Sequence, residues 1–404
     1  MTDDTLAPLP LPAGIRSRFA EDINGLTMHF LEAGFEGSGG KPGEAADDGR
    51  PCVLLLHGFP ELAYSWRKVM LPLAAAGYRV IAPDQRGYGR TTGWDPDYDG
   101  DLQSYRMLNL VRDALGLVSA LGLRSVDAVV GHDFGSFVAA WCALLRPDIF
   151  RSLVLMSAPF AGPPPLPFGN AASDGAAGAR PGSPVPAPVD IHAALAALPR
   201  PRKHYQWYYS GREAASDMLH APQGLHQFLR AYYHHKSADW PDNRPYELSA
   251  WAAGELQKLP TYYVMDLHEG MAQTVAREMP TPDAIAANRW LPDDELRVYS
   301  GEFARTGFQG SLQWYRCLTG PTFVAELQVW SGRTIDVPAT FIAGSSDWGI
   351  HQRPGQLAQM REQACTRMSP VQLIDGAGHW VQQEQPAEVA RLLLAHLQRA
   401  ANSR

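Results

Sequence analysis

Short apolar runs alternate with longer amphipathic stretches along the first part of the chain. The apolar runs are rich in Val, Leu and Ile and lie at Cys52–Leu56, Arg79–Ala82, Val126–Val130 and Leu153–Met156. Such runs are typical of strands that are buried on both faces of a parallel sheet. The stretches between them have the length of helices and lie at Trp66–Ala76, Tyr105–Leu121 and Ser136–Leu145. This alternation predicts a mostly parallel sheet covered by helices on both faces.

The pattern stops at Ala161. The segment 161–201 is crowded with Pro, Gly, Ala and Ser, including the runs Pro163–Pro165 and Pro184–Pro188. Such a segment forms neither a central strand nor a long helix. From about Tyr205 to Trp330 the chain is rich in aromatic residues at helix-compatible spacing, which predicts a helical insertion.

The strand pattern returns after this insertion, at Ala339–Ala343 and Val371–Ile374. The chain then closes with an amphipathic helix from about Pro386 to Gln398. A second low-complexity stretch, Gly37–Gly49, is predicted to be a solvated loop between two early strands.

The interruption of one sheet by one insertion predicts two domains. We expect a core domain of residues 1–160 and 331–404, and a cap domain of residues 161–330 that begins with the Pro/Gly-rich connection 161–201. In open α/β sheets the active site lies at the carboxyl ends of the strands. The cap is therefore expected to cover that site.

Composition excludes several classes of partner. The chain has 404 residues, of which 45% are hydrophobic and 19% charged, the balance of an ordinary globular protein. Its net charge of -7 leaves no basic surplus for nucleic acid or an anionic membrane. The chain contains no apolar run of membrane-spanning length, and Asp3 and Asp4 stand where a leader would be basic, so a cytoplasmic location is predicted.

The four cysteines are far apart and share no CxxC spacing, which favours buried thiols over disulfides or a zinc site. They are Cys52, Cys142, Cys317 and Cys365. We expect no metal or other cofactor. The oligomeric state is not predicted by the sequence.

The strongest chemical signal is the pentapeptide Gly131–Gly135, Gly-His-Asp-Phe-Gly, placed between a predicted strand and a predicted helix. A nucleophile at the centre of such a turn needs small residues two positions away on either side, because larger side chains would collide. Asp133 is therefore the candidate nucleophile. The alternative is that Asp133 only caps the following helix, because Asp is a favoured N-cap.

Two further loops follow the last two strands of the predicted sheet. Gly376–Trp380 carries His379, and Gly344–Asp347 carries Asp347. A carboxylate in that position can accept the Nδ1–H of a histidine and fix its tautomer. Nucleophile, acid and histidine also follow one another in the order this kind of sheet uses. Asp375 and Asp336 are the other candidates for the acid.

These motifs resemble those of the epoxide hydrolases of the α/β-hydrolase superfamily. The matching segments are His57–Glu61, Asp84–Gly89, Gly131–Gly135, Gly344–Asp347 and Gly376–Trp380. The resemblance implies an α/β-hydrolase fold, with a mostly parallel eight-stranded sheet flanked by helices and an inserted helical cap.

The same resemblance assigns roles to further residues. Tyr205 and Tyr315 match the two cap tyrosines that open the epoxide ring in that family, although Tyr208 and Tyr209 are close enough to compete with the first. The backbone N–H groups of Phe59 and Phe134 would form the oxyanion hole. The residues expected to line the substrate site are His57, Pro60 and Trp380.

The chemistry of an aspartate nucleophile agrees with this assignment. A serine that attacked an sp³ carbon would leave a stable ether, whereas a carboxylate leaves an ester that water can cleave. Because Asp133 is already ionised near neutral pH, His379 is free to deprotonate that water. The predicted reaction is therefore attack on an epoxide or a halide.

The leaving group distinguishes these two reactions. An epoxide oxygen leaves as an alkoxide and needs O–H donors, which the tyrosine pair supplies. Halide-releasing relatives usually place Trp directly after the nucleophile, where this chain has Phe134, and often Asn or Trp where it has Phe59. Fluoroacetate-type relatives carry arginines near the nucleophile, but the helix after Asp133 has none before Arg146.

We therefore predict an epoxide hydrolase that converts a small apolar epoxide and water to a vicinal diol. Two alternatives stay open. The first is a haloalkane or haloacid dehalogenase of the same fold. The second is a catalytically silent scaffold that binds a small apolar ligand, in which Tyr205 and Tyr315 would be ordinary core aromatics of the cap.

Overall fold

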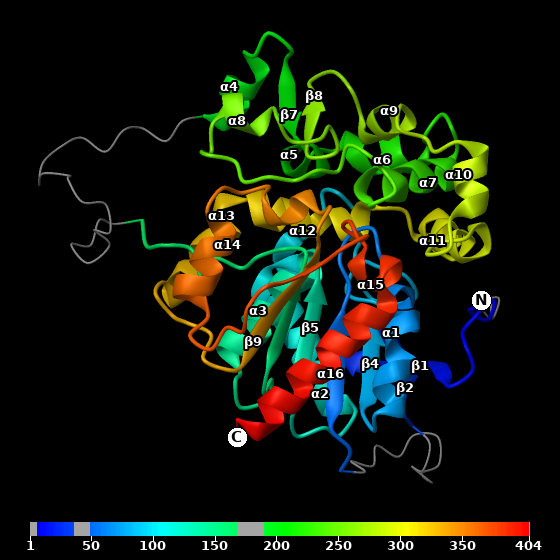
Figure 1. The fold of residues 1–404 in the computed structure, drawn as a ribbon, viewed down its shortest axis with the longest axis vertical. Coiled ribbons are helices and arrows are strands. Elements are labelled where there is room, and N and C mark those ends of the chain that lie inside the picture. The colour runs from blue at the N-terminus through cyan, green and yellow to red at the C-terminus, as the bar shows by residue number, and fades with distance from the viewer. Residues whose placement is uncertain (1–5, 36–48, 168–189, 404) are drawn as a thin grey trace, which may run out of the picture.

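The centre of the molecule is one eight-stranded sheet with the order β1-β2-β4-β3-β5-β6-β9-β10 (Figure 1). The computed structural model describes residues 6–35, 49–167 and 190–403. The strands are β1 (Ile15–Ile23), β2 (Leu26–Ala33), β3 (Cys52–Leu56), β4 (Arg79–Pro83), β5 (Ala128–His132), β6 (Leu153–Met156), β9 (Ala339–Gly344) and β10 (Gln372–Ile374). β1 and β2 run antiparallel to their neighbours, and the other six strands are parallel.

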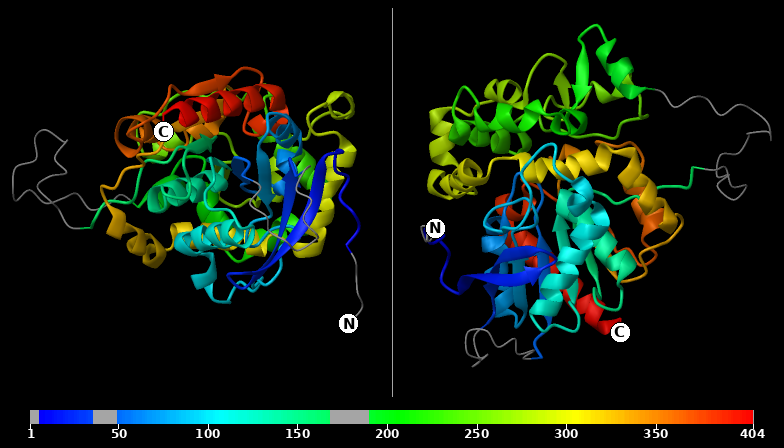
Figure 2. Two further views of the ribbon diagram at one scale, coloured as in Figure 1. Left: turned by 90° about the horizontal axis from the view of Figure 1, so that it is seen from below. Right: turned by 180° about the vertical axis from the view of Figure 1, so that it is seen from behind.

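The central strands are buried on both faces, as their continuous apolar runs predict. Within β3 the side chains of Leu54 and Leu55 point to opposite faces and belong to two different hydrophobic clusters. Helices cover both clusters. α1 and α16 pack together on one face, and α2 and α3 pack together on the other (Figures 1 and 2).

The helices and helical turns of this part of the chain are η1 (Ala63–Trp66), α1 (Arg67–Ala75), η2 (Leu102–Tyr105), α2 (Met107–Ala120), α3 (Phe134–Leu145), η4 (Trp348–Ile350), α14 (Gln356–Gln359), the π-helical turn η5 (Met360–Ala364), α15 (Val381–Glu384) and α16 (Pro386–Asn402). The predicted eight-stranded α/β-hydrolase sheet is confirmed, with shifts only at the ends of elements. Val126 forms an isolated bridge with Phe150, and the strand proper begins at Ala128. The last helix continues to Asn402, four residues past its predicted end at Gln398.

A helical segment, residues 190–330, lies over the carboxyl ends of the parallel strands (Figure 1). We call it the cap. Its elements are α4 (Ile191–Ala196), β7 (Arg202–His204), α5 (Tyr205–Tyr209), α6 (Glu213–Leu219), α7 (Leu225–Lys236), α8 (Ala253–Leu256), β8 (Val264–Asp266), α9 (Met271–Ala276), α10 (Pro282–Ala287), α11 (Asp293–Thr306), α12 (Gln309–Thr319), α13 (Pro321–Leu327) and η3 (Gln328–Trp330).

Parts of two predicted segments lie outside the described residues. These are most of the loop Gly37–Gly49 and residues 168–189 of the Pro/Gly-rich connection, including Pro184–Pro188. Where the description resumes, Asp190 caps α4 by accepting the N–H groups of His192 and Ala193. Within the described part of the chain, no helix combines the length and the apolar character needed to cross a membrane.

Two buried arginines of the core tie the cap to the sheet through α11. Arg90, in the loop after β4, donates its Nε–H to Glu302 of α11 at 2.8 Å, and both side chains are buried. Arg67 of α1 pairs with Glu295, about two turns earlier on the same helix. A buried ion pair need not raise overall stability, but removal of one partner leaves a buried charge unpaired. These pairs therefore fix the position of α11 over the core.

We expect Glu302→Gln to lower the free energy of unfolding by about 3 kcal/mol, because Arg90 would stay buried without a counter-charge. Urea denaturation measures the change. The matched control is Asp148→Asn, which removes the carboxylate of the exposed pair with Arg146 and should have no measurable effect. Equal free energies of unfolding for the two variants would show that the buried Arg90–Glu302 pair does not affect stability.

Candidate active site

Asp133 occupies a sharp turn between β5 and α3. Its backbone has φ 52° and ψ -121°, a strained conformation that L-residues rarely adopt. A Cβ on Gly131 would lie 2.1 Å from the carbonyl oxygen of Gly135, and one on Gly135 would lie 2.4 Å from that of Leu56. Only glycine fits at these two positions, so the pentapeptide forces the helix to start directly at the end of the strand.

The carboxylate of Asp133 is buried and held at both oxygens. Oδ1 accepts the backbone N–H of Phe59 at 3.0 Å, and Oδ2 lies 3.3 Å from Nε2 of His379. Burial alone would raise the pKa of Asp133, but the contact with His379 outweighs it and the pKa lies well below its ordinary value. The carboxylate is therefore ionised and aimed into the space beneath the cap.

His379 stands between two carboxylates. Its Nδ1 lies 3.1 and 3.2 Å from the two oxygens of Asp347, which also accepts the N–H of Gly349 at 2.7 Å. Burial and the nearby Lys236 ammonium lower the pKa of His379. Asp347 and Asp133 act in the opposite direction and prevail, so this pKa lies above its ordinary value. Asp347 fixes the tautomer that leaves Nε2 directed at Asp133.

The two competing acids do not contact this histidine. Asp336 is exposed and accepts hydrogen bonds from Thr334 and Thr366, and Asp375 is exposed on the loop after β10. Nε2 of His379 makes no well-aligned hydrogen bond within the described residues, although it lies at ion-pair distance from Asp133. This nitrogen is the one available to a water molecule.

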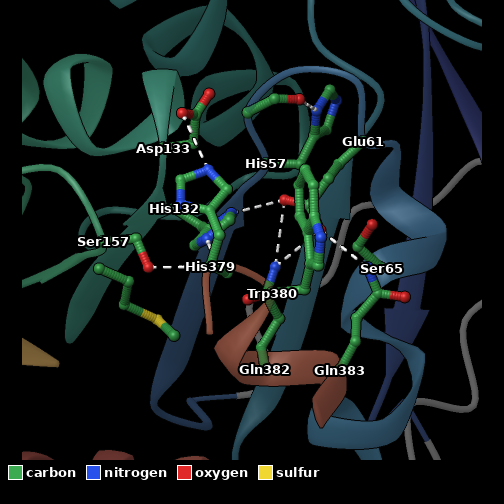
Figure 3. Close-up of polar contacts among 12 residues, drawn as sticks. His57, Glu61, Ser65, His132, Asp133, Ser157, His379, Trp380, Gln382 and Gln383 are labelled. Carbon is green, nitrogen blue, oxygen red and sulfur yellow. Dashed lines mark hydrogen bonds and ion pairs between the residues drawn. The ribbon is translucent and has the colours of Figure 1, made fainter. Parts of the chain in front are cut away.

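A second buried pair, Glu61 and His132, lies behind the first and was not predicted from the sequence. Glu61 Oε2 is 2.6 Å from Nδ1 of His132, and both side chains are fully buried (Figure 3). Nε2 of His132 donates to the backbone carbonyl of His379 at 2.7 Å. Burial would raise the pKa of Glu61, but His132 holds it below its ordinary value. Both ring nitrogens of His132 therefore face oxygen atoms, one of Glu61 and one of the His379 backbone.

Further hydrogen bonds hold the loop that carries His379. Glu61 also accepts the side-chain amides of Gln382 and Gln383, each at 2.9 Å. Ser157 donates its hydroxyl to the carbonyl of His379 at 3.2 Å. Glu61 and His132 belong to the segments His57–Glu61 and Gly131–Gly135, so the motifs contain them although no role was assigned to either.

The same loop is also bound to the cap by Glu384 of α15. Its carboxylate accepts three backbone N–H groups, from Ala238 at 2.8 Å, Gly378 at 2.9 Å and Trp380 at 3.0 Å. Ala238 follows α7 in the cap, whereas the other two donors flank His379. Burial raises the pKa of Glu384 to about 8, although the three N–H groups act in the opposite direction. Glu384 thus joins the histidine loop to the cap through three backbone hydrogen bonds.

Tyr205 and Tyr315 approach Asp133 from the cap. Their ring centroids are 6.0 Å apart, and the Tyr315 ring packs 5.4 Å from that of Phe134. The Tyr205 hydroxyl donates to Gln352 at 3.1 Å. Burial, and after it the Asp133 carboxylate, raises the pKa of both tyrosines. Both are therefore protonated donors at neutral pH.

The two neighbouring tyrosines have other partners. Tyr208 donates to Asp217, and its hydroxyl accepts the N–H of Met271 at 3.1 Å. Tyr209 donates to the hydroxyl of Tyr232 at 3.1 Å. Burial is the largest cause of the raised pKa of all three tyrosines, and the Asp133 carboxylate adds to it for Tyr205 but not for Tyr208 or Tyr209. This arrangement favours Tyr205 as the first cap donor.

The residues expected to line the substrate site surround the triad in different ways. His57 contacts the backbone of Gly58 and Gln85 through its ring nitrogens, so it supports the loop. The Pro60 carbonyl accepts the hydroxyl of Tyr233 at 3.2 Å. The Trp380 and His379 rings meet edge to face, with their centroids 4.8 Å apart. Their roles toward substrate, and the role of the Phe134 N–H in an oxyanion hole, stay predictions.

Among the described residues no group of His, Cys, Asp or Glu side chains is arranged to hold a metal ion. All four cysteines are buried, as residues that serve in packing would be. The polar groups beneath the cap are thus a carboxylate, an imidazole with its acid, a backbone donor and two tyrosine hydroxyls. Fold and site together define an α/β-hydrolase with an aspartate at the nucleophile turn.

Comparisons with known proteins agree with that class. The family model of the alpha/beta hydrolase fold matches residues 51–386. Epoxide hydrolase A of Mycobacterium tuberculosis is 31% identical over 93% of this chain and 95% of its own length. Epoxide hydrolase B of the same organism is 32% identical over 87% of this chain and 92% of its own.

Solved structures give the same result. An epoxide hydrolase from an endophytic Streptomyces superposes with a TM-score of 0.70 at 30% identity and covers 97% of each chain. Potato (Solanum tuberosum) epoxide hydrolase I gives a TM-score of 0.68 at 28% identity, over 95% of this chain and 99% of its own. Among the α/β-hydrolases, this chain belongs to the epoxide hydrolase family.

We expect Glu61→Gln to destabilise the protein by about 3 kcal/mol at pH 7, because the buried nitrogens of His132, Gln382 and Gln383 would lose their shared carboxylate partner. The pKa of Glu61 is depressed in the folded protein, so the stability it contributes is present above its ordinary value of 4.5 and is lost as the pH falls through the lower folded value. The deficit of the variant should therefore shrink in acid. Urea denaturation between pH 7 and pH 3.5 measures it.

Glu388→Gln is the matched control, because Glu388 pairs with Arg391 on the exposed face of α16. Its stability should follow that of the parent at every pH. A deficit of the Glu61 variant that stays constant into acid would contradict an ionised Glu61.

Proposed function

We propose that this protein hydrolyses small apolar epoxides to vicinal diols through a covalent ester on Asp133. The observation that carries the proposal is an ionised aspartate at the nucleophile turn, with a histidine on one side and a pair of protonated tyrosines above it. The names and coverage of the relatives support the same activity. The proposed domains are a core of residues 1–160 and 331–404 and a cap of residues 161–330.

In the first step the Asp133 carboxylate attacks one epoxide carbon. A carbon–oxygen bond forms on the carboxylate, the ring carbon–oxygen bond breaks, and the epoxide oxygen takes a proton from Tyr205 or Tyr315. Both tyrosines have raised pKa values, so each donates a hydrogen bond to the oxygen as an uncharged, protonated hydroxyl. The proton is transferred only as the ring opens.

In the second step His379 takes a proton from a water molecule, which adds to the ester carbonyl. The negative charge that develops on the former Oδ1 is stabilised by the N–H of Phe59, which already donates to that oxygen at 3.0 Å, and by the N–H of Phe134. As the intermediate collapses, the ester oxygen leaves with the diol and takes the proton back from His379. The carboxylic acid left on Asp133 then loses its proton, which returns through solvent to the tyrosine that gave its proton in the first step. Asp347 stabilises the imidazolium between these events.

The partners that follow are water and a small epoxide. The net charge of -7 supports a small-molecule substrate rather than nucleic acid. We also propose that the protein is cytoplasmic, as the sequence predicts. A dehalogenase is the second candidate, but its halide would need N–H donors where Tyr205 and Tyr315 present hydroxyls.

We expect His379→Gln to consume about one equivalent of epoxide and then to stall as an ester, because His379 acts only in the second step. Intact mass should increase by the mass of the epoxide, and heavy-oxygen label from water should stay out of the protein. The parent should form diol from aryl and alkyl epoxides and release no halide from 1-haloalkanes or fluoroacetate. Asp133→Asn, the control, should form no adduct. Halide release without diol formation would establish the dehalogenase instead.

We expect Tyr205→Phe/Tyr315→Phe to slow alkylation of Asp133 strongly, because each donor contributes about 2–4 kcal/mol in the transition state. Either single variant should lose less, since the remaining hydroxyl compensates. Stopped-flow measurement of adduct formation gives the rate. Tyr208→Phe is the matched control from the same helix, and it should alkylate at the parental rate. If the double variant alkylates as fast as that control, both tyrosines only pack in the core of the cap.

A further inference from the structure

Lys236, the last residue of α7, is a buried lysine enclosed by aromatic rings. Its side chain is 3% exposed. The ammonium lies 5.0 Å from the ring centroid of Tyr263, 5.4 Å from Trp380, 5.5 Å from Tyr232 and 5.7 Å from Tyr262. The negative faces of aromatic rings favour a cation at such distances. Within the described residues, no carboxylate lies at ion-pair distance from this ammonium.

The end of α7 is packed directly against the histidine loop. The N–H of His379 donates to the backbone carbonyl of Lys236 at 2.9 Å. The indole N–H of Trp380 donates to the carbonyl of Tyr233, one turn earlier, at 2.8 Å. Trp380 contributes one wall of the ring enclosure and also packs 4.8 Å from the His379 ring. These contacts hold the backbone of Lys236 against the histidine loop, and the Lys236 ammonium and the His379 ring both pack against Trp380.

Burial of a charged lysine side chain costs free energy, because its ammonium group loses its hydration. Burial lowers the pKa of Lys236, whereas the carboxylates of Asp133, Asp347 and Glu61 act in the opposite direction. A leucine or methionine would fill a space between four aromatic rings without that desolvation cost. The position therefore points to an electrostatic role.

The charges around His379 show what that role is. From the loop after β5, Asp133 faces Nε2, and from the loop after β9, Asp347 faces Nδ1. Both favour the imidazolium, which cannot accept a proton from water. The His132 ring lies 5.1 Å away on β5 and is paired with Glu61. Lys236 is the cation of α7 that opposes the two carboxylates.

We propose that Lys236 is a positioning residue for the ester-hydrolysis step: its caged cation beside His379 keeps the imidazole neutral while the ester is present on Asp133. The proposal rests on the function assigned above. Formation of the ester removes the charge of Asp133, so Asp347 alone then favours the imidazolium and Lys236 balances it. Lys236 acts through His379 and takes no part in the bonds that form or break.

The decisive test measures the titration of His379 without any turnover. Asp133→Asn replaces the nucleophile by a neutral group of the same shape, as in the ester. In this background, NMR of ¹³C-labelled histidine follows His379, whose signal is assigned by its loss in His379→Gln. Lys236→Met should raise the pH at which His379 titrates, because a nearby positive charge is removed.

Lys203→Met is the matched control. Its ammonium also lies over an aromatic ring of the cap, 4.8 Å from the centroid of Tyr208, but it does not contact the histidine loop. It should leave the His379 titration unchanged. An unchanged titration in Lys236→Met, or an equal change in both lysine variants, would overturn the proposal even if the protein is an epoxide hydrolase. Lys236→Gln, a second uncharged variant, should shift the titration in the same direction.

Kinetics with an epoxide substrate give a second readout. In Lys236→Met the acid limb of ester hydrolysis should move to higher pH, so that hydrolysis near pH 6 falls by roughly tenfold, the factor that corresponds to one pH unit. Alkylation of Asp133 should change less, since its carboxylate stays ionised. Lys236→Arg retains the charge and should keep the parental profile. The same shift in Lys236→Arg as in Lys236→Met would overturn the proposal, because it would show a structural effect.

Discussion

The close packing of one turn against the sheet determines the rest of this active site. Because Gly131 and Gly135 lie against neighbouring backbone atoms, α3 starts at the very end of β5, and Asp133 is held with a positive φ at the tip of the turn. The turn presents the carboxylate to a backbone donor from the loop after β3 and to a histidine from the loop after β10. Everything else in the site is arranged around a nucleophile whose position the backbone has fixed.

The site also shows how buried charges are kept in balance. Asp133 and Asp347 share His379, Glu61 is paired with His132, and Lys236 lies among aromatic rings at the end of α7. Each carboxylate has a cation or several N–H donors nearby, which is the condition for keeping it ionised away from water. In the proposed reaction, the negative charge that leaves Asp133 and later returns to it therefore moves among groups that are already fixed in place.

Much of the core could be predicted because its signals are local. Buried strands show as continuous apolar runs, and the nucleophile turn, the acid and the histidine each follow a strand by a few residues, so Asp133, Asp347 and His379 were found together. The ends of elements were less certain, as at Val126, where one residue pairs outside the main ladder. Lys236 and Glu384 could not be predicted, because their roles depend on contacts between segments more than a hundred residues apart. Glu61 lay inside a recognised motif, but its partnership with His132 is visible only once two strands are side by side.

The bonds between α7 and the histidine loop bear on how this protein can evolve. His379 and Trp380 donate to carbonyl groups of the cap, and Glu384 binds N–H groups of both the loop and the cap. The cap is thus bonded directly to the loop that carries His379, the proposed general base. Mutations in α7 that widen the cavity for a new substrate will also displace the base. One such mutation therefore changes both the substrate range and the catalytic rate. Variation that leaves the base undisturbed is confined to cap helices away from this junction, such as α13, which packs against α12 and η3.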